Sequence, residues 1–327
     1  MDISIIIKAY NEENNIAKAI QSSLKSLKKY NGEVIVVDSL SSDDTVKIAK
    51  KYPIKIVQLN KNSIKTPAAA LEVGYRASKG QYLLVIDGDM VLNQEFIKRA
   101  LPKFKDKNIG AVGGLIYWPD VGNIISKRFH KKYKKIKIGQ VEYLDGGGLY
   151  NKKAIKQVGY LSNPYLFSGE ESELGYELIK RNYKIIRLNI PFATHYFDKD
   201  STPRILLRKW KTRYMFGFGQ VLRLSISSGF FIKYLLKLRI YILTLIWYIL
   251  LLIVILSLKF SFIPFLIYSI ITLILAITLL IKKRSLKEGF FSIFSWAITT
   301  TGIVCGFFKP SKTAKDYNLK FKLIKNV

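Results

Sequence analysis

The first 90 residues alternate short apolar runs with segments in which apolar residues recur every three or four positions. The apolar runs are rich in Val and Ile, as in strands buried on both faces of a parallel sheet. They cover residues 3–7, 33–38, 54–59 and 81–87, and the helical segments between them cover 11–27, 43–51 and 67–78. Strands that alternate with helices predict an α/β fold with a mostly parallel, Rossmann-like sheet.

The pattern after residue 90 is less regular. It predicts helices at 93–104 and 170–181 and strands at 109–118 and 184–189. The basic run 126–137 fits a helix face or a loop, and the glycine-rich stretch 143–150 must form a tight backbone feature. Residues 203–239 mix basic, aromatic and apolar side chains, which is typical of amphipathic helices in a membrane interface.

Three long uncharged runs follow, at 240–258, 260–281 and 289–308. Each is close to the roughly 20 residues that a helix needs to cross a bilayer. The first two predict a hairpin with its outer turn near Lys259, and the loop "KKRSLKE" is then cytoplasmic because positive loops stay inside. The third run is less hydrophobic, and both a span and a re-entrant segment are open. The predicted organisation is an α/β domain at 1–202, interfacial helices at 203–239, membrane helices at 240–308 and a basic tail at 309–327.

The chain has a formal net charge of +30 over 327 residues. After Asp200 the acidic residues are Glu288 and Asp316, while Lys and Arg continue to the end. Because this basic excess flanks membrane segments, we expect anionic membrane lipid as a partner. We expect no nucleic acid, since no nucleic-acid-binding motif accompanies the charge. The N-terminus lacks the features of a signal peptide, so we expect a multi-pass protein of the cell membrane whose α/β domain lies in the cytoplasm.

Acidic side chains follow three of the predicted strands, at the edge where such sheets bind ligands. Asp87 and Asp89 end the fourth strand, and carboxylates two residues apart can share one Mg²⁺ or Mn²⁺. Asp38 ends the second strand, while Tyr10 and Glu12 end the first; a base or ribose can bind there. Turn formation and helix capping are the alternatives for each site taken singly. Their coincidence on one edge favours a ligand site.

Four motifs carry a family resemblance: "SIIIKAYNEENNI", "VVDSLSSDDT", "VIDGDM" and "GEESEL". Their order and spacing resemble those of family 2 glycosyltransferases with the GT-A fold, over residues 3–200. With the membrane segments added, the chain is similar to membrane-bound enzymes of exopolysaccharide and lipid-linked glycan assembly. The resemblance implies an inverting, Mg²⁺- or Mn²⁺-dependent enzyme that moves a sugar from a nucleotide-sugar donor to a polyprenyl-based, lipid-linked acceptor.

The resemblance also implies a role for each residue of the donor site. Asp38 would bind the nucleotide base, and Asp87 the ribose or metal side of the donor, with Tyr10 and Glu12 in the same nucleotide-sugar site. Asp89 would hold the metal, which neutralises charge on the departing nucleoside diphosphate. His195 stands near the place of a third metal ligand in some members, and an ordinary packed histidine is equally open.

A second set of residues would serve catalysis and the acceptor. Glu171 aligns with the base that takes a proton from the acceptor hydroxyl, whereas acids that favour a helix start are the alternative. Gly147 and Glu170 are acceptor-site candidates. Arg204, Arg208 and Trp210 can grip a lipid-linked diphosphate or simply lie in the membrane interface.

Some positions depart from the family pattern. Lys8 stands where the family usually has Pro, and Glu177 where it usually has Arg. The sequence "LLRKW" breaks the Gln-x-x-Arg-Trp motif of processive synthases, which argues against a polymerising enzyme. A polyprenyl-phosphate sugar synthase similar to dolichol-phosphate-sugar synthases is one alternative, and a non-catalytic membrane scaffold that retains the fold is the other.

Overall fold

The structure is a computed structural model that describes residues 2–61, 64–119, 121–133, 135–196, 202–309, 314 and 320–326. The chain divides into two compact units. One unit consists of Met1–Thr202 together with Ser311–Val327, and the other of Pro203–Pro310. The first unit therefore contains both ends of the chain.

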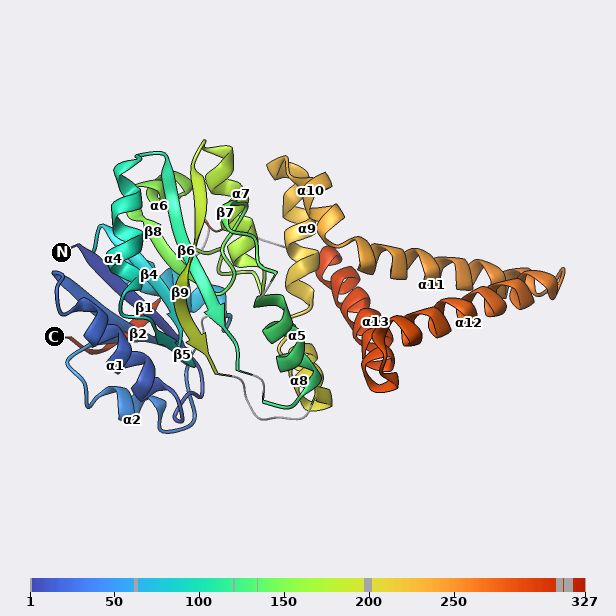
Figure 1. Ribbon diagram of the computed structural model, residues 1–327, viewed down its shortest axis with the longest axis horizontal. Helices are drawn as coiled ribbons and strands as arrows, with labels where there is room; N and C mark the ends of the chain where they lie inside the picture. Colours follow the sequence, from blue (N-terminus) through green and yellow to red (C-terminus); the bar gives the residue numbers. More distant parts are fainter. Residues whose placement is uncertain are drawn as a thin grey trace. The chain divides into compact units, whose positions relative to one another are not determined.

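The first unit is built on a mixed sheet. Its described strands are β1 (Ile3–Ala9), β2 (Gly32–Asp38), β3 (Lys55–Leu59), β4 (Tyr82–Asp87), β5 (Met90–Leu92), β6 (Ile109–Tyr117), β7 (Gly139–Val141), β8 (Gly148–Asn151), β9 (Lys184–His195) and β10 (Phe321–Lys325). Their order is β10-β3-β2-β1-β4-β8-β6-β9-β5, and β7 pairs with β9 (Figure 1). Strands β3, β2, β1 and β4 are parallel, so their carboxyl ends meet at one edge. The Rossmann-like α/β prediction is confirmed, and antiparallel β8 and β10 flank the parallel strands.

Helices cover both faces of this sheet. They are α1 (Ile16–Leu27), α2 (Thr45–Ala49), α3 (Pro67–Ala77), α4 (Phe96–Ala100), the 3₁₀ helix η1 (Leu101–Lys105), α5 (Ile124–Tyr133), α6 (Lys152–Val158) and α7 (Glu170–Lys180). Successive strand side chains point to opposite faces. In β1, Ile5 and Ile7 therefore pack into one core with α1, and Ile6 into the other core with α3.

Some helix boundaries differ from the predictions for physical reasons. The helix predicted from residue 11 begins at Ile16, because Asn11 has a left-handed φ of 56° and belongs to the turn after β1. The helix predicted at 93–104 divides into α4 and η1 near Pro102, which has no backbone N–H to continue an α-helix. The basic run 126–137 is largely helical, in α5.

The second unit is helical. It contains α8 (Thr202–Lys211), α9 (Phe216–Ser228), α10 (Phe231–Lys237), α11 (Arg239–Ser257), α12 (Ile263–Lys283) and α13 (Leu286–Phe308). In the described part of the chain, α11, α12 and α13 are long and apolar enough to cross a membrane. Helix α13 packs closely on α9, since a Cβ on Gly306 would lie 1.9 Å from the Phe216 carbonyl oxygen. That 203–239 lies in the membrane interface stays a prediction.

The C-terminal tail returns to the first unit. Its strand β10 pairs antiparallel with β3, and Phe321 lies opposite Leu59. The sequence predicts only a basic tail for this segment. Its sequence "FKLIK" is short and alternates with lysines, so the pattern alone does not distinguish this strand from a solvated tail.

Candidate active site

The predicted acidic strand ends lie together at the carboxyl edge of the parallel strands. In the strand register, Lys8 of β1 pairs with Asp87 of β4, and Ala9 pairs with Asp38 of β2. Three neighbouring parallel strands thus deliver polar side chains to one edge, as the βαβ pattern predicted.

Asp87, Asp89 and His195 form a group that can hold a metal ion. Each offers one ligand atom, and these atoms lie within 4.8 Å of one another. Strand β5 pairs antiparallel with the end of β9, which places His195 beside Asp89. Asp89 Oδ1 is buried and has no hydrogen-bond partner among the described residues. A buried carboxylate oxygen without a donor is costly unless a cation binds it, so the residues fit a divalent ion.

Hydrogen bonds on both ring nitrogens orient His195. Trp118 Nε1 donates to His195 Nδ1 at 3.2 Å, and His195 Nε2 lies 3.0 Å from Asp89 Oδ2. Burial lowers the pKa of His195, but the hydrogen bond and charge of Asp89 raise it, with a net rise. A cation would therefore compete with the His195 proton for Asp89.

Lys8 lies among acidic side chains in the same crevice. Its Nζ is 2.9 Å from Asp87 Oδ1 and 3.8 Å from Glu170 Oε1, and its side chain is 13% exposed. Burial lowers the pKa of Lys8, whereas Asp87, Glu170 and Glu171 raise it, and the net result is a higher pKa. Lys8 is therefore charged and neutralises part of a carboxylate cluster.

Glu171 lies at the start of α7, after Gly169 with φ of 83°. Its Oε1 accepts a hydrogen bond of 3.0 Å from the Gly146 amide, so the glycine-rich segment holds this carboxylate. Burial and the charge of Glu170 raise the pKa of Glu171 to about 8, against the opposite effect of Lys8. A base poised near neutral pH suits proton abstraction from a hydroxyl.

The third acid of this helix start has a different environment. Glu173 is buried and accepts a hydrogen bond from the Tyr160 hydroxyl, and burial raises its pKa to about 8. Glu171 faces the acid cluster, whereas Glu173 ties α7 to the segment after α6. The sequence alone did not separate these two roles.

The nucleotide candidates are positioned differently from one another. Asp38 is fully buried and accepts hydrogen bonds from the amides of Leu40 and Ser41 and from Gln58 Nε2, at 3.0, 3.1 and 2.7 Å. Tyr10 is 58% exposed, which leaves its ring open to a ligand. The Glu12 amide donates to Thr45 Oγ1 at 2.7 Å. The Glu12 side chain lies beside Gly88, the residue between Asp87 and Asp89.

Two family models match the chain. Residues 4–159 match the model "Glycosyl transferase family 2", and residues 82–281 match "Glycosyl transferase family group 2". The second match alone covers more than half of the chain. This protein belongs to the family 2 glycosyltransferases.

This family 2 glycosyltransferase is similar to curated archaeal enzymes. A dolichyl N-acetyl-alpha-D-glucosaminyl phosphate 3-beta-D-2,3-diacetamido-2,3-dideoxy-beta-D-glucuronosyltransferase of Methanococcus voltae is 23% identical over 256 residues, 70% of this chain and 75% of that protein. A dolichol-phosphate mannosyltransferase of Pyrococcus furiosus is 28% identical over 138 residues, 39% of each chain. The match thus spans well under half of the second relative.

Solved structures share the fold of this glycosyltransferase. A mannosyltransferase from Pyrobaculum calidifontis, solved with GDP-Man and Mn²⁺, aligns with a TM-score of 0.58 and 14% identity over 94% of this chain and 87% of that one. The GT-A fold expected from the sequence motifs is thereby confirmed.

The glycosyltransferase site also contains residues that the sequence did not identify. Trp118 and Gly146 contact two of the predicted site residues, and the sequence marks Lys8 only as a departure from the family pattern. A lysine that ends an otherwise apolar strand was the available signal for Lys8. Arg204, Arg208 and Trp210 lie on α8 of the second unit, and their role in acceptor binding stays a prediction.

Proposed function

We propose that this glycosyltransferase moves a sugar, with inversion, from a nucleotide-sugar donor to a polyprenyl- or other lipid-linked acceptor at the inner face of the membrane. The observation that carries the proposal is the convergence of Asp87, Asp89 and His195 at one sheet edge. A lipid-linked acceptor is supported by the names of the two archaeal relatives, of which one refers to a dolichyl phosphate sugar and the other to dolichol phosphate.

The proposed division of labour follows from the geometry. Asp87, Asp89 and His195 would hold Mg²⁺ or Mn²⁺, which supplies positive charge against the growing charge of the leaving nucleoside diphosphate. Glu171, held by the Gly146 amide, takes the proton of the acceptor hydroxyl as that oxygen attacks the anomeric carbon. The charge of Lys8 opposes the rise in the pKa of Glu171, which must be ionised in order to accept a proton.

The second candidate acceptor is the lipid phosphate itself. The relative from Pyrococcus furiosus favours it, since its name describes transfer to dolichol phosphate. A phosphate oxygen is ionised at neutral pH and needs no general base. Replacing Glu171 by glutamine therefore distinguishes the two candidates: it should stop transfer to a sugar hydroxyl and spare transfer to a phosphate.

The test uses the purified full-length protein with Mn²⁺ or Mg²⁺, a panel of nucleotide sugars, polyprenyl phosphate and polyprenyl-diphosphate sugars. Asp89→Asn and Glu171→Gln are compared with Asp106→Asn, an exposed acid, and Glu173→Gln, an acid of the same helix. Transfer to a sugar that survives Asp89→Asn and Glu171→Gln would contradict the mechanism. If no donor in the panel is either transferred or hydrolysed, the result would favour a non-catalytic membrane scaffold.

We further propose that α11 and α12 cross the membrane as a hairpin and that α13 lies in the membrane without crossing it. The chain leaves the first unit after Thr202 and belongs to it again from Ser311, and β10 is a strand of its sheet. A chain that leaves and re-enters one side of a membrane crosses it an even number of times. Helix α13 is the least apolar of the three and buries part of its surface against its neighbours.

Cysteine labelling tests this topology. In a Cys305→Ser background, single cysteines are introduced at Lys259, between α11 and α12, at Lys29 and at Asn326. A membrane-impermeant maleimide added to intact cells should label position 259, and positions 29 and 326 only after permeabilisation. Labelling of position 326 from outside would show three crossings and refute the hairpin arrangement.

A further inference from the structure

A cavity of about 700 Å³ lies at the opposite edge of the sheet from the candidate active site. Its wall includes Tyr82, the first residue of β4, and Asn151, which pairs with Tyr82 from the end of β8. Asp87 is the last residue of β4. At about 3.3 Å per residue, the length of β4 from Tyr82 to Asp87 places the cavity roughly 16 Å from the metal-binding group.

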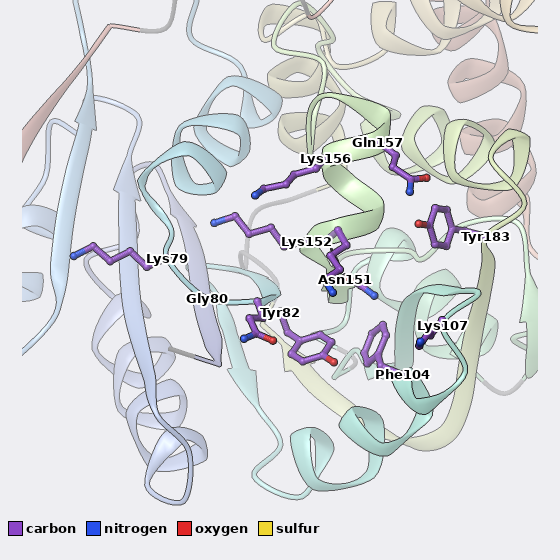
Figure 2. Close-up of a pocket in the computed structure, with 12 residues that line it drawn as sticks. Lys79, Gly80, Tyr82, Phe104, Lys107, Asn151, Lys152, Lys156, Gln157 and Tyr183 are labelled. Carbon is purple, nitrogen blue, oxygen red and sulfur yellow. Dashed lines mark hydrogen bonds between the residues drawn. The ribbon is translucent and has the colours of Figure 1, made fainter.

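The cavity is cationic. Its described lining contains no carboxylate and five lysines: Lys79, Lys107, Lys152, Lys153 and Lys156. Lys152 and Lys156 extend from α6 on the same side of the cavity (Figure 2). Within the described part of the chain, Lys107, Lys153 and Lys156 are not engaged in ion pairs. Like charges around a concave surface repel one another unless an anion binds between them.

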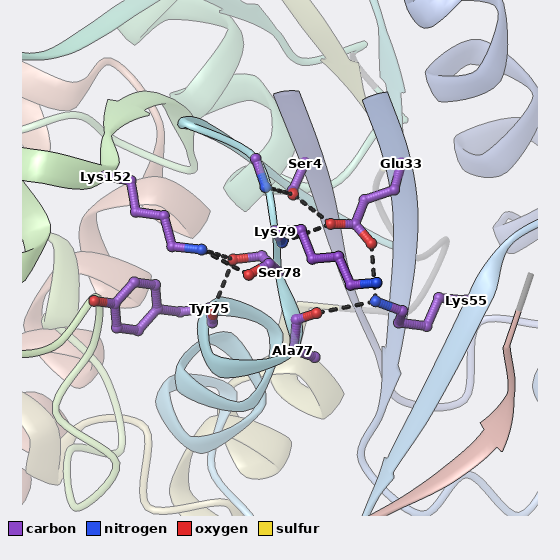
Figure 3. Close-up of polar contacts among 9 residues, drawn as sticks. Ser4, Glu33, Lys55, Tyr75, Ala77, Ser78, Lys79 and Lys152 are labelled. Atoms are coloured by element: carbon purple, nitrogen blue, oxygen red, sulfur yellow. Dashed lines mark hydrogen bonds and ion pairs between the residues drawn. The ribbon is translucent and has the colours of Figure 1, made fainter. Parts of the chain in front are cut away.

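The neighbouring acids are engaged elsewhere. Glu33 accepts hydrogen bonds from Ser4 Oγ at 2.8 Å and from the Lys79 amide at 2.7 Å, and it pairs with Lys55 Nζ at 2.9 Å (Figure 3). Asp106 accepts from the Asn108 amide and from Lys184. These contacts use the acids that could otherwise have neutralised the cavity.

One lysine is held in place. Lys152 Nζ donates to the Ser78 carbonyl at 2.6 Å and to Ser78 Oγ at 3.1 Å (Figure 3). Burial, followed by the charge of Lys156, lowers the pKa of Lys152. A positive group that is fixed and already repelled by its neighbour is stabilised when an anion approaches.

An aromatic wall accompanies the lysines. The rings of Tyr82 and Phe104 lie 4.9 Å apart, and Tyr183 also lines the cavity (Figure 2). The volume is within the range of pockets that enclose small molecules. A concave site with aromatic rings and several lysines fits a ligand that combines a flat ring with negative charges better than it fits a flat lipid surface.

We propose that this cavity is a second ligand site, distinct from the donor site, that binds a small phosphorylated molecule of the nucleotide class. The phosphates lie among the lysines, and the base lies against Tyr82 and Phe104. The proposal is independent of the transferase reaction, because it concerns binding at the other edge of the sheet.

The test is direct binding to the full-length protein in nanodiscs of uncharged lipid, with EDTA and the Asp89→Asn substitution to weaken the donor site. Inorganic pyrophosphate and UDP are the probes, measured by calorimetry, and hydrogen exchange at residues 79–82 and 151–157 identifies the site. Lys107→Glu with Lys156→Glu is compared with Lys29→Glu with Lys51→Glu, which changes the charge equally outside the cavity.

We expect both probes to protect these segments. The cavity double variant should weaken the binding of both probes by at least ~10-fold, since it reverses two charges that would contact the phosphates. Tyr82→Leu should weaken UDP and spare pyrophosphate, because pyrophosphate has no ring. The proposal is overturned if neither probe protects the segments, if the control variant loses as much affinity, or if Tyr82→Leu leaves UDP binding unchanged. Binding restricted to anionic vesicles would also overturn it, in favour of a lipid surface.

Discussion

Replacing Lys8 by methionine removes an ammonium group that lies among three carboxylates. Lys8 Nζ is 2.9 Å from Asp87 and 3.8 Å from Glu170, and the charge of Glu171 also acts on it. Methionine keeps the length and apolar stem of the side chain, so the substitution tests the charge rather than the packing. In the absence of metal, the carboxylates of the variant have no positive charge beside them from β1.

The expected cost can be worked from these distances. At an effective dielectric constant of 20, the two contacts correspond to about 6 and 4 kcal/mol of attraction before desolvation is subtracted. Removing one partner of a buried ion pair typically leaves a net loss of about 3–5 kcal/mol. For a domain of this size, that loss corresponds to a melting temperature roughly 6–20 °C lower.

The loss should grow with pH. The pKa of Glu171 is already raised to about 8 by burial and by Glu170, and removing Lys8 raises it further. An acid whose pKa is higher in the folded state binds more protons there than in the unfolded chain. Stability therefore falls as pH rises from about 4.5 through the folded pKa. Lys8→Met should be more destabilised, relative to wild type, at pH 8.5 than at pH 5.5.

The assay is thermal unfolding of the full-length protein in EDTA at both pH values, with Lys55→Met as control. Lys55 also lies 2.9 Å from its partner, Glu33, and is 12% exposed. Burial raises the pKa of Glu33, but hydrogen bonds give a net lowering, so Glu33 is ionised at both pH values. The loss of stability in Lys55→Met should therefore depend little on pH. An equal loss for Lys8→Met at the two pH values would refute the reasoning, as would a pH dependence no larger than the control's.

Three further predictions concern the backbone and the base. A Cβ on Gly147, which has φ of 114°, would lie 2.2 Å from the Val85 carbonyl oxygen, whereas Gly139, with φ of 86°, has open space. Gly139→Ala should lower the free energy of unfolding by about 1–2 kcal/mol through backbone strain alone, and Gly147→Ala by roughly 1–3 kcal/mol more. Melting temperatures measure the difference, and equal shifts for the two variants would exclude the steric contact. Glu171→Gln should lower the turnover rate for a hydroxyl acceptor about 10²–10⁴-fold. The wild-type rate should rise with pH up to about 8, where Glu171 ionises. A wild-type rate that falls over this pH range would argue against Glu171 as the base. Gly306→Leu should separate α13 from α9 and lower the melting temperature, whereas an unchanged value would show that the two backbones do not touch.

The sequence predicted the parallel half of the sheet because β1 to β4 are runs of apolar, mostly β-branched residues separated by helical patterns. It did not predict β5, β7 or β8, which have three, three and four residues. Such short segments carry too little periodicity, and pairing with β4, β6 or β9 determines their conformation.

The same limit applies to the site. Asp87, Asp89 and Glu171 could be found because an acid at the end of a strand or the start of a helix is visible in the sequence. The bond between Trp118 and His195 joins residues far apart in the chain, and so does the contact of Lys8 with Glu170. No spacing rule connects such pairs, so only the folded chain reveals them.

The pairing of β10 with β3 has a consequence for biosynthesis. Phe321 is translated long after Leu59, its partner, and after all three apolar helices. At about 5–20 residues per second, β3 waits roughly 13–50 s with an unpaired edge, while the three apolar helices are still being translated. An open strand edge is a template for wrong pairing, so the nascent domain is exposed to mispairing and aggregation during this interval. A recombinant fragment that stops at residue 202 would never close this edge, and supplying residues 320–326 as a peptide should improve its solubility.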